Sequence, residues 1–140
     1  MPTTSLSAEQ IAEKQVLAAL RLWDAEDYVS AITLAGAAEE ILGKRLRACG
    51  KEPSFDNVKN AIIRLSERLG KSDPKTERVV TELLNSTRNE LKHYAGDEAL
   101  EFDLYEDSIE LLERAITNYM ILTGVIHDEM ISLWGRVDGT

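Results

Sequence analysis

Apolar residues recur three or four positions apart along most of this chain, which is the spacing that places them on one face of an α-helix. No segment alternates apolar and polar residues with the period of two that a half-buried β-strand requires. The pattern is longest between Leu104 and Leu133, where apolar positions follow one another in steps of four and three. The spacing therefore predicts an all-α fold.

Capping and turn residues divide this pattern into five predicted helices. Ser7 and Gln10 have the spacing of a capping box, Asp73 precedes a proline, and Gly50 and Gly70 stand where helices commonly end. The predicted helices are Ser7–Trp23, Tyr28–Cys49, Asp56–Leu69, Asp73–Ala95 and Leu104–Leu133. Because the connections are short, residues 1–140 are expected to form a single domain, an up-and-down helical bundle with loose ends at 1–6 and 135–140.

The last predicted helix, at the C-terminus, is long compared with its partners. At about 1.5 Å per residue, its roughly thirty residues would extend beyond partner helices of about fourteen to twenty-two residues. Unless this helix bends near Gly124, its apolar end needs a cover. A second copy of the chain is the simplest cover, because two-fold dimers are the commonest oligomers. We therefore expect a homodimer.

The formal net charge of -9 argues against general attachment to nucleic acid or to an anionic membrane surface. The charge is uneven, with 12 Lys and Arg against 7 Asp and Glu between residues 44 and 92, and 4 against 18 elsewhere. The candidates for a basic patch are Lys44, Arg45, Arg47, Lys51, Lys59, Arg64 and Arg68. They are either the solvated faces of two helices or a local surface that meets phosphate.

The cysteine content and the hydropathy indicate a cellular compartment. Cys49 is the single cysteine, so an internal disulfide cannot form and a zinc site built from several thiolates is not expected. The longest nearly apolar run, residues 119–126, is too short to cross about 30 Å of hydrocarbon. The first residues also lack the apolar stretch of a signal peptide. We expect a cytoplasmic protein without a membrane partner.

The sequence TRNELKHY, residues 87–94, concentrates residues suited to phosphodiester chemistry. The imidazole of His93 can accept or return a proton near neutral pH, and the guanidinium of Arg88 can hold two phosphate oxygens. On an ideal helix these two residues lie about 140° apart, whereas Asn89 and His93 share a face. Arg88 and His93 therefore converge only if the helix unwinds near Lys92 or if two subunits build the site.

This motif resembles the R-x(4-6)-H motif of the HEPN superfamily, with Asn89 as the polar residue usual after the arginine. The segment AITLAGAAEEILGKRL, Ala31–Leu46, is similar to the second-helix pattern of small bacterial HEPN-like proteins. The two segments cover about a sixth of the chain. The resemblance implies a helical bundle that dimerises and places two such motifs in a shared cleft.

Many HEPN proteins are metal-independent endoribonucleases, often toxins paired with a nucleotidyltransferase antitoxin. Others are non-catalytic modules that bind a nucleotide, RNA or a protein. The resemblance implies catalytic roles for Arg88, Asn89 and His93, substrate contacts from Lys92 and Tyr94, and no metal or other cofactor. In some toxin members the antitoxin modifies a tyrosine two residues beyond the histidine. Here Tyr94 is directly adjacent, so the resemblance does not extend to that regulation.

Glu39 raises a structural alternative, because it lies beside an apolar stripe and a half-buried carboxylate needs a partner. The alternative is that Glu39 pairs with Arg88, which would make the arginine a clasp between helices rather than a phosphate ligand. The two roles are compatible, because the carboxylate would also orient the guanidinium toward phosphate. Glu90 and His93 also have the E-x-x-H spacing of di-iron bundles, but a second such pair is missing, so a metal site is not predicted. His127 is expected to be an exposed histidine.

Overall fold

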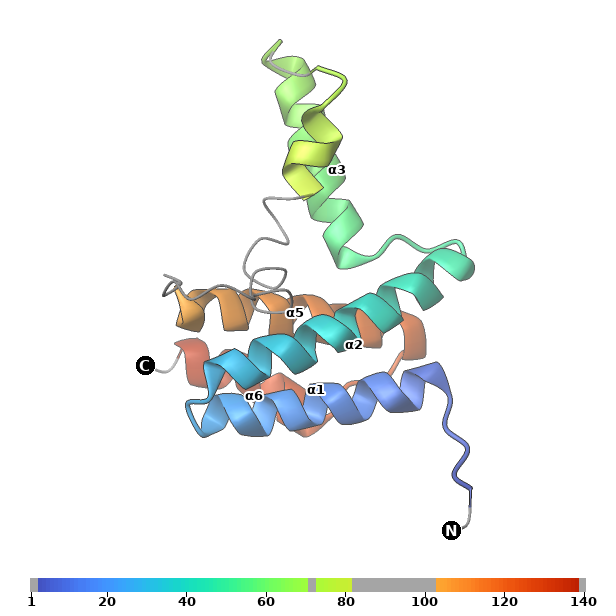
Figure 1. The fold of residues 1–140 in the computed structure, drawn as a ribbon, viewed down its shortest axis with the longest axis vertical. Coiled ribbons are helices and arrows are strands. Elements are labelled where there is room, and N and C mark those ends of the chain that lie inside the picture. Colours follow the sequence, from blue (N-terminus) through green and yellow to red (C-terminus); the bar gives the residue numbers. More distant parts are fainter. Residues whose placement is uncertain (1–2, 71–72, 82–102, 139–140) are drawn as a thin grey trace, which may run out of the picture.

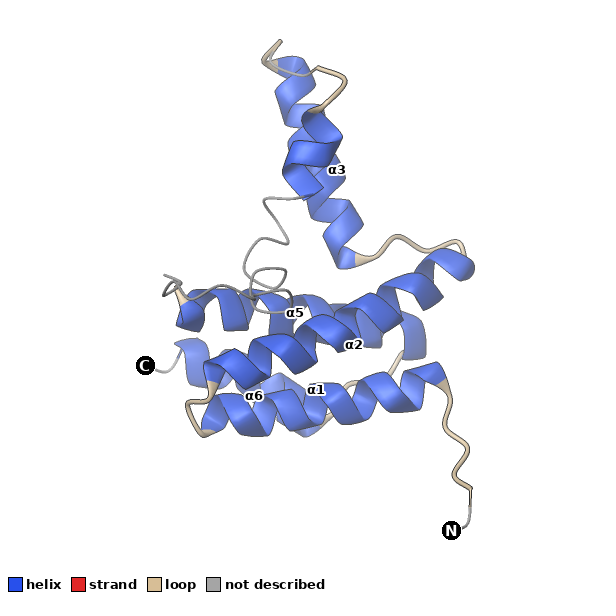
Figure 2. Ribbon diagram, viewed as in Figure 1, coloured by secondary structure: helices blue, strands red, loops and turns tan. Residues whose placement is uncertain are grey.

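The computed structural model describes residues 3–70, 73–81 and 103–138, and within these ranges the chain is helical without a β-strand (Figures 1 and 2). The helices are α1 (Ala8–Asp24), α2 (Tyr28–Ala48), α3 (Ser54–Arg68), α5 (Leu104–Thr123) and α6 (Asp128–Asp138), with a further helical stretch at 76–81. The predicted all-α class is confirmed for the described residues.

The first two helices begin within one residue of their predicted starts. The Ser7 hydroxyl accepts the Gln10 backbone N–H at 3.1 Å, and the Gln10 side chain accepts the Ser7 N–H at 2.8 Å. This reciprocal pair satisfies two donors that the helix itself leaves without partners, so the predicted capping box is confirmed. Asp27 caps α2 in a similar way by accepting the Ser30 N–H at 3.2 Å.

Four helices, α1, α2, α5 and α6, share one hydrophobic core. The apolar faces of α1 and α2 pack against each other and against α5, because the spacing of three and four places their apolar residues on one side of each helix. Helix α6, which packs against α1, adds Met130 and Leu133 to this core. The large side chains that are fully buried there include Val16, Leu20, Ile32, Leu42, Leu112 and Ile116. This core fixes the position of α2, the helix that carries Glu39.

The predicted continuous helix Leu104–Leu133 is wrong, because the chain breaks at Gly124. Gly124 has a φ of 71°, a left-handed conformation that glycine adopts without a Cβ clash, and it ends α5. The chain then turns back, and α6 packs against α1 (Figure 1). The prediction of a loose tail from residue 135 is also wrong for residues 135–138, because these residues belong to α6. The overhanging helix that suggested a dimer is therefore absent.

The strict up-and-down order is also wrong, because α2 and α5 run in the same direction (Figure 1). At their N-terminal ends the Tyr28 and Tyr105 rings lie 5.6 Å apart, and just beyond the C-terminal end of α2 the Ser54 N–H donates to Asn118 Oδ1 at 2.8 Å. Two neighbouring parallel helices need a connection that crosses the length of the bundle.

Helix α3 and the helical stretch at 76–81 project away from the other four helices (Figure 1). Lys59 Nζ joins the two through an ion pair with Glu77 Oε1 at 3.3 Å, and Phe55 is buried where α3 meets the bundle. The prediction of a helix over Asp56–Leu69 is confirmed within two residues at each end. Most of the helix predicted at Asp73–Ala95 lies outside the described residues.

Candidate functional site

The residues that carry the R-x(4-6)-H motif lie outside the described residues. These are Arg88, Asn89, Lys92, His93 and Tyr94, together with Glu90 of the E-x-x-H pair. Their predicted roles stay predictions. Of the candidate site residues taken from the sequence, Glu39 is the one whose surroundings the structure gives.

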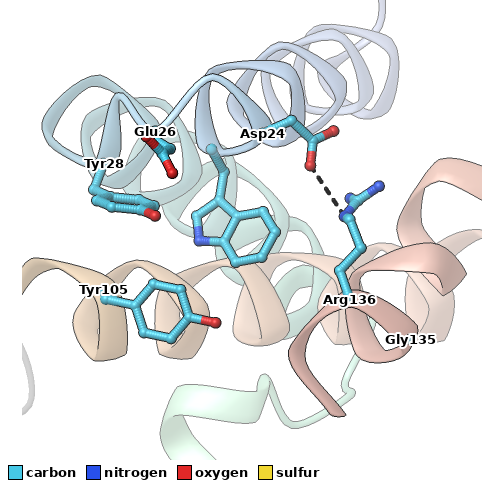
Figure 3. A pocket seen from close by; sticks show the side chains of 7 residues that line it. Asp24, Glu26, Tyr28, Tyr105, Gly135 and Arg136 are labelled. Atoms are coloured by element: carbon cyan, nitrogen blue, oxygen red, sulfur yellow. Dashed lines mark ion pairs between the residues drawn. The ribbon is translucent and has the colours of Figure 1, made fainter. Parts of the chain in front are cut away.

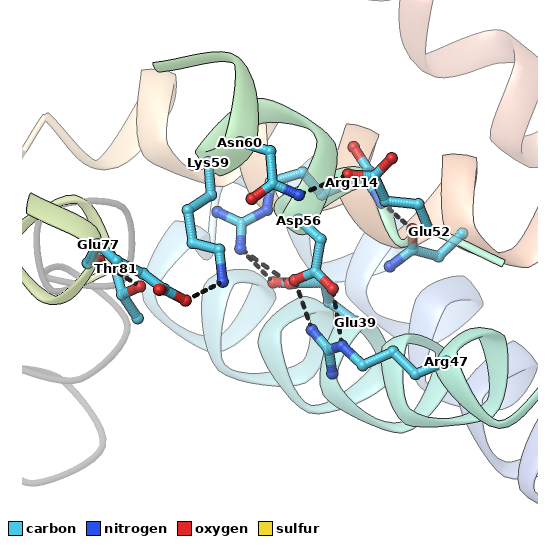
Figure 4. A network of polar contacts seen from close by, with 11 residues as sticks. Glu39, Arg47, Glu52, Asp56, Lys59, Asn60, Glu77, Thr81 and Arg114 are labelled. Carbon is cyan, nitrogen blue, oxygen red and sulfur yellow. Dashed lines mark hydrogen bonds and ion pairs between the residues drawn. The ribbon is translucent and has the colours of Figure 1, made fainter. Parts of the chain in front are cut away.

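Glu39 is buried between α2 and α5 and forms an ion pair with Arg114 (Figure 4). Each residue is only 6% exposed. The Arg114 Nη2 donates to both carboxylate oxygens of Glu39, at 2.8 Å each, and the guanidinium lies 4.7 Å from the centre of the Phe55 ring. A buried carboxylate is tolerated only with such a compensating partner. The expectation that Glu39 needs a partner is confirmed, and Arg114 supplies the charge.

The sequence contains a signal for Arg114 that lies outside the main apolar stripe of the predicted C-terminal helix. Leu111, Ala115 and Asn118 are spaced by four and three, which defines a second buried face on α5 beside the main stripe. Arg114 lies on that face, next to Ala115. A charged residue in the middle of a buried face signals a buried ion pair. Only the packing of α2 on α5 identifies its partner.

A second ion pair, between α2 and α3, continues the polar network toward the projecting helix (Figure 4). Arg47 donates through Nε and Nη2 to the two carboxylate oxygens of Asp56, at 2.8 Å each. The hydrogen bonds from Arg47 hold the pKa of Asp56 below its ordinary value of 3.8. Asn60 adds a hydrogen bond to Glu52 at 2.8 Å, which ties α3 to the loop before it.

Most of the candidate basic patch is paired within the molecule. The pairs are Lys44 with Glu40, Arg45 with Glu9, Arg47 with Asp56 and Lys59 with Glu77. Lys51 Nζ lies 3.4 Å from the Ile121 carbonyl oxygen, and Arg64 and Arg68 make no ion pair with a described residue. These contacts favour the interpretation that the cations solvate helix faces, because their charge is largely neutralised at short range.

His127, expected to be exposed, instead contacts α1 and α5. Its Nε2 lies 3.3 Å from Glu13 Oε1, and the Tyr119 hydroxyl donates to the other oxygen of Glu13 at 2.8 Å. The His127 and Tyr119 rings lie 5.9 Å apart. Burial and then the hydrogen bond to Glu13 raise the pKa of Tyr119 above its ordinary value of 10.0. The cluster fixes the turn between α5 and α6 against α1.

Neither metal ligation nor membrane insertion finds support in the part of the chain that the structure describes. Within residues 3–70, 73–81 and 103–138, no group of three or more His, Cys, Asp and Glu side chains is arranged to hold a metal ion. No described helix combines the length and the apolar character needed to cross a membrane. The Cys49 thiol is free and exposed at the C-terminal end of α2.

The chain matches no known family model, no curated protein and no solved structure. The structure by itself defines the class, an all-helical protein whose described core comprises four helices. The fold carries a buried Glu–Arg pair and a projecting helix, α3.

Proposed function

We propose that this chain is a HEPN-like homodimer that cleaves RNA without a metal, through Arg88 and His93. The proposal starts from the motif and from the Ala31–Leu46 pattern, which falls within α2. Glu39, the buried acidic residue of that pattern, already has its charge compensated by Arg114. This one observation supports the phosphate role of Arg88, because Arg114 already supplies a counter-charge to Glu39.

The reaction would proceed by attack of a ribose 2'-hydroxyl on the adjacent phosphorus. His93 would accept the proton of the hydroxyl as the new O–P bond forms, and an imidazolium would return a proton to the leaving 5' oxygen. Arg88, assisted by Lys92, would stabilise the negative charge that develops on the phosphate oxygens. Asn89 and Tyr94 would orient the substrate. The products are a 2',3'-cyclic phosphate end and a free 5'-hydroxyl end.

The test is cleavage of a structured RNA by the purified full chain in EDTA, with the product ends identified. A matched substrate that carries 2'-O-methyl groups should remain intact, because its nucleophile is blocked. His93→Ala should lower the rate by about 100-fold or more, the range expected for loss of a general acid or base. His127→Ala is the matched control, because it removes the chain's other histidine, which contacts Glu13 at the turn between α5 and α6.

The dimeric site has its own test. If Arg88 and His93 of one site come from different copies, a mixture of inactive Arg88→Ala and inactive His93→Ala chains should recover part of the activity. Light scattering of each variant should give the mass of two chains. A monomer, or a mixture that stays inactive although each variant is dimeric, contradicts the composite site.

The remaining outcomes separate the other interpretations. RNA that is bound but not cleaved supports the non-catalytic module, and neither binding nor cleavage rejects both RNA functions. A large loss of thermal stability in Arg88→Ala, without effect on RNA binding, supports the clasp. Growth arrest on expression, relieved by a nucleotidyltransferase encoded beside this chain, would support a toxin role.

A further inference from the structure

A pocket of about 480 Å³ opens at the end of the bundle where α1 ends and α2 and α5 begin (Figure 3). It is lined by Trp23, Asp24, Glu26, Tyr28, Tyr105, Gly135 and Arg136. These residues come from α1, α2, α5 and α6 and from the turn that joins α1 to α2. None of them belongs to the candidate RNA site, so this pocket is independent of the proposed function.

Three aromatic rings form the apolar wall of the pocket. Trp23 is stacked against Tyr105 with ring centres 5.9 Å apart, and Tyr28 meets the edge of Tyr105 at 5.6 Å. The Trp23 indole N–H donates to Ser108 Oγ at 3.0 Å, which fixes the orientation of its ring. Neither tyrosine hydroxyl is hydrogen-bonded to a described residue. The wall presents π-electron faces and edges to the pocket.

A cation already lies on this wall. The guanidinium of Arg136 lies 5.6 Å from the centre of the Trp23 ring, and its Nε lies 3.0 Å from Asp24 Oδ1 (Figure 3). Arg136 neutralises Asp24 and occupies one side of the pocket. The contact demonstrates that the indole face accepts a planar organic cation, which is the known preference of aromatic rings for positive charge.

Glu26 leaves the pocket with an uncompensated negative charge. Its side chain is exposed and forms no ion pair with a described residue. Its φ is 64°, in the left-handed region that a non-glycine residue seldom adopts. The backbone bond from the Glu26 N–H to the Trp23 carbonyl, at 3.0 Å, holds this turn. This conformation belongs to the C-terminal cap of α1, because the Asp27 N–H also donates to the Leu22 carbonyl at 2.9 Å. The cap holds Glu26 at the pocket.

We propose that this pocket binds an organic cation, a quaternary ammonium or guanidinium group, on the rings of Trp23, Tyr28 and Tyr105 beside Glu26. The aromatic wall supplies cation–π attraction and apolar contact for methyl groups. Glu26 supplies the net negative charge, since Arg136 cancels that of Asp24. An anion would meet the Glu26 carboxylate, and a neutral ligand would gain nothing from it.

The experiment follows the two indole N–H signals of the full chain by NMR, with Trp23→Phe and Trp134→Phe used for assignment. Choline, methylguanidine and 3,3-dimethyl-1-butanol, the neutral isostere of choline, are titrated separately. The two cations should shift the Trp23 signal saturably, and the neutral isostere should bind at least about tenfold more weakly. Comparison of free choline with a peptide that carries trimethyllysine identifies whether the cation belongs to a small molecule or to a protein side chain.

Two variants separate charge from shape. Glu26→Gln keeps the size of the side chain and should weaken choline binding about fivefold, as expected for loss of one partly solvated charge. Tyr105→Leu should weaken it about tenfold or more. Glu67→Gln, with the same charge change on the exposed surface of α3, is the control and should have no effect.

Equal binding of choline and its neutral isostere would overturn the proposal. So would equal effects of Glu26→Gln and Glu67→Gln, or no saturable shift of the Trp23 signal with any of the cations. The dispersion of the NMR spectrum reports folding in each variant, so Glu26→Gln still decides the question if Tyr105→Leu fails to fold.

Discussion

At the scale of single residues, the buried pair of Glu39 and Arg114 specifies how α2 packs on α5. Two opposite charges in a buried interface oppose displacement, because a shift of one helical turn would separate the Glu39 carboxylate from the Arg114 guanidinium. The Phe55 ring lies against the Arg114 guanidinium, and so the pair also positions the start of α3.

We predict that Arg114→Ala lowers the free energy of unfolding by about 3–5 kcal/mol, because it leaves the Glu39 carboxylate buried without its counter-charge. Urea denaturation followed by circular dichroism measures the change. Arg114→Met combined with Glu39→Leu should recover most of the loss, because an apolar pair needs no compensation. Arg45→Ala, which breaks the exposed pair with Glu9, is the control and should cost less than about 1 kcal/mol. A similar small cost for Arg114→Ala would contradict the prediction.

At the scale of the elements, Gly124 decides whether the C-terminal region forms one helix or two. Nothing lies within 4 Å of a Cβ placed there, so the φ of 71° is the whole reason for glycine at this position. A continuous helix would carry Met130 and Leu133 away from the bundle, whereas the break lets α6 bury both in the core. Burial of two large apolar side chains outweighs the few helical hydrogen bonds lost at the turn.

We predict that Gly124→Ala destabilises the protein by about 1 kcal/mol, because a residue with a Cβ is strained in the left-handed conformation. Gly135→Ala is a matched control, because Gly135 also has open space around it but lies within a helix. The same substitution there should stabilise by about 0.5–1 kcal/mol. Thermal unfolding of both variants checks the opposite signs, and a change of the same sign in both would falsify this account of the break.

At the scale of the whole molecule, Asp56 and Tyr119 both contribute to the dependence of stability on pH, because folding shifts their pKa values. In the folded state the pKa of Asp56 is lowered, so the ionised form is favoured by Arg47. Its contribution to stability is present above the unfolded pKa of about 3.8 and is lost as pH falls through the folded value. In the folded state the pKa of Tyr119 is raised, so its contribution is present below pH 10 and is lost as pH rises through the folded value.

We predict that Asp56→Asn is less stable than the natural chain at pH 7, by less than about 1 kcal/mol because the pair is partly exposed. The difference should disappear as the pH falls below the folded pKa of Asp56. Tyr119→Phe should instead flatten the loss of stability above pH 10. Urea midpoints measured from pH 2 to pH 11 test both, and a difference for Asp56→Asn that persists unchanged at pH 2 would contradict the assignment.

Local patterns in the sequence were sufficient for the first three helices. The capping box at Ser7, the start of α2 at Tyr28 and the extent of α3 depend on neighbours a few residues away, so they could be predicted. The burial of Glu39 also followed from its place beside an apolar stripe. The motif residues Arg88 and His93 stay a prediction, because they lie outside the described residues.

The contacts between distant segments could be identified only from the tertiary structure. The sequence marks Glu39 as a residue that needs a partner but cannot select Arg114, 75 positions away. The parallel course of α2 and α5 and the return of α6 onto α1 depend on which apolar stripes bury each other, and several pairings satisfy the same spacing. The pocket beside Trp23 arises for the same reason, because only the packed bundle brings Tyr105 and Arg136 to the end of α1. Hydrogen bonds within a helix are local, whereas the burial that places one helix against another is not.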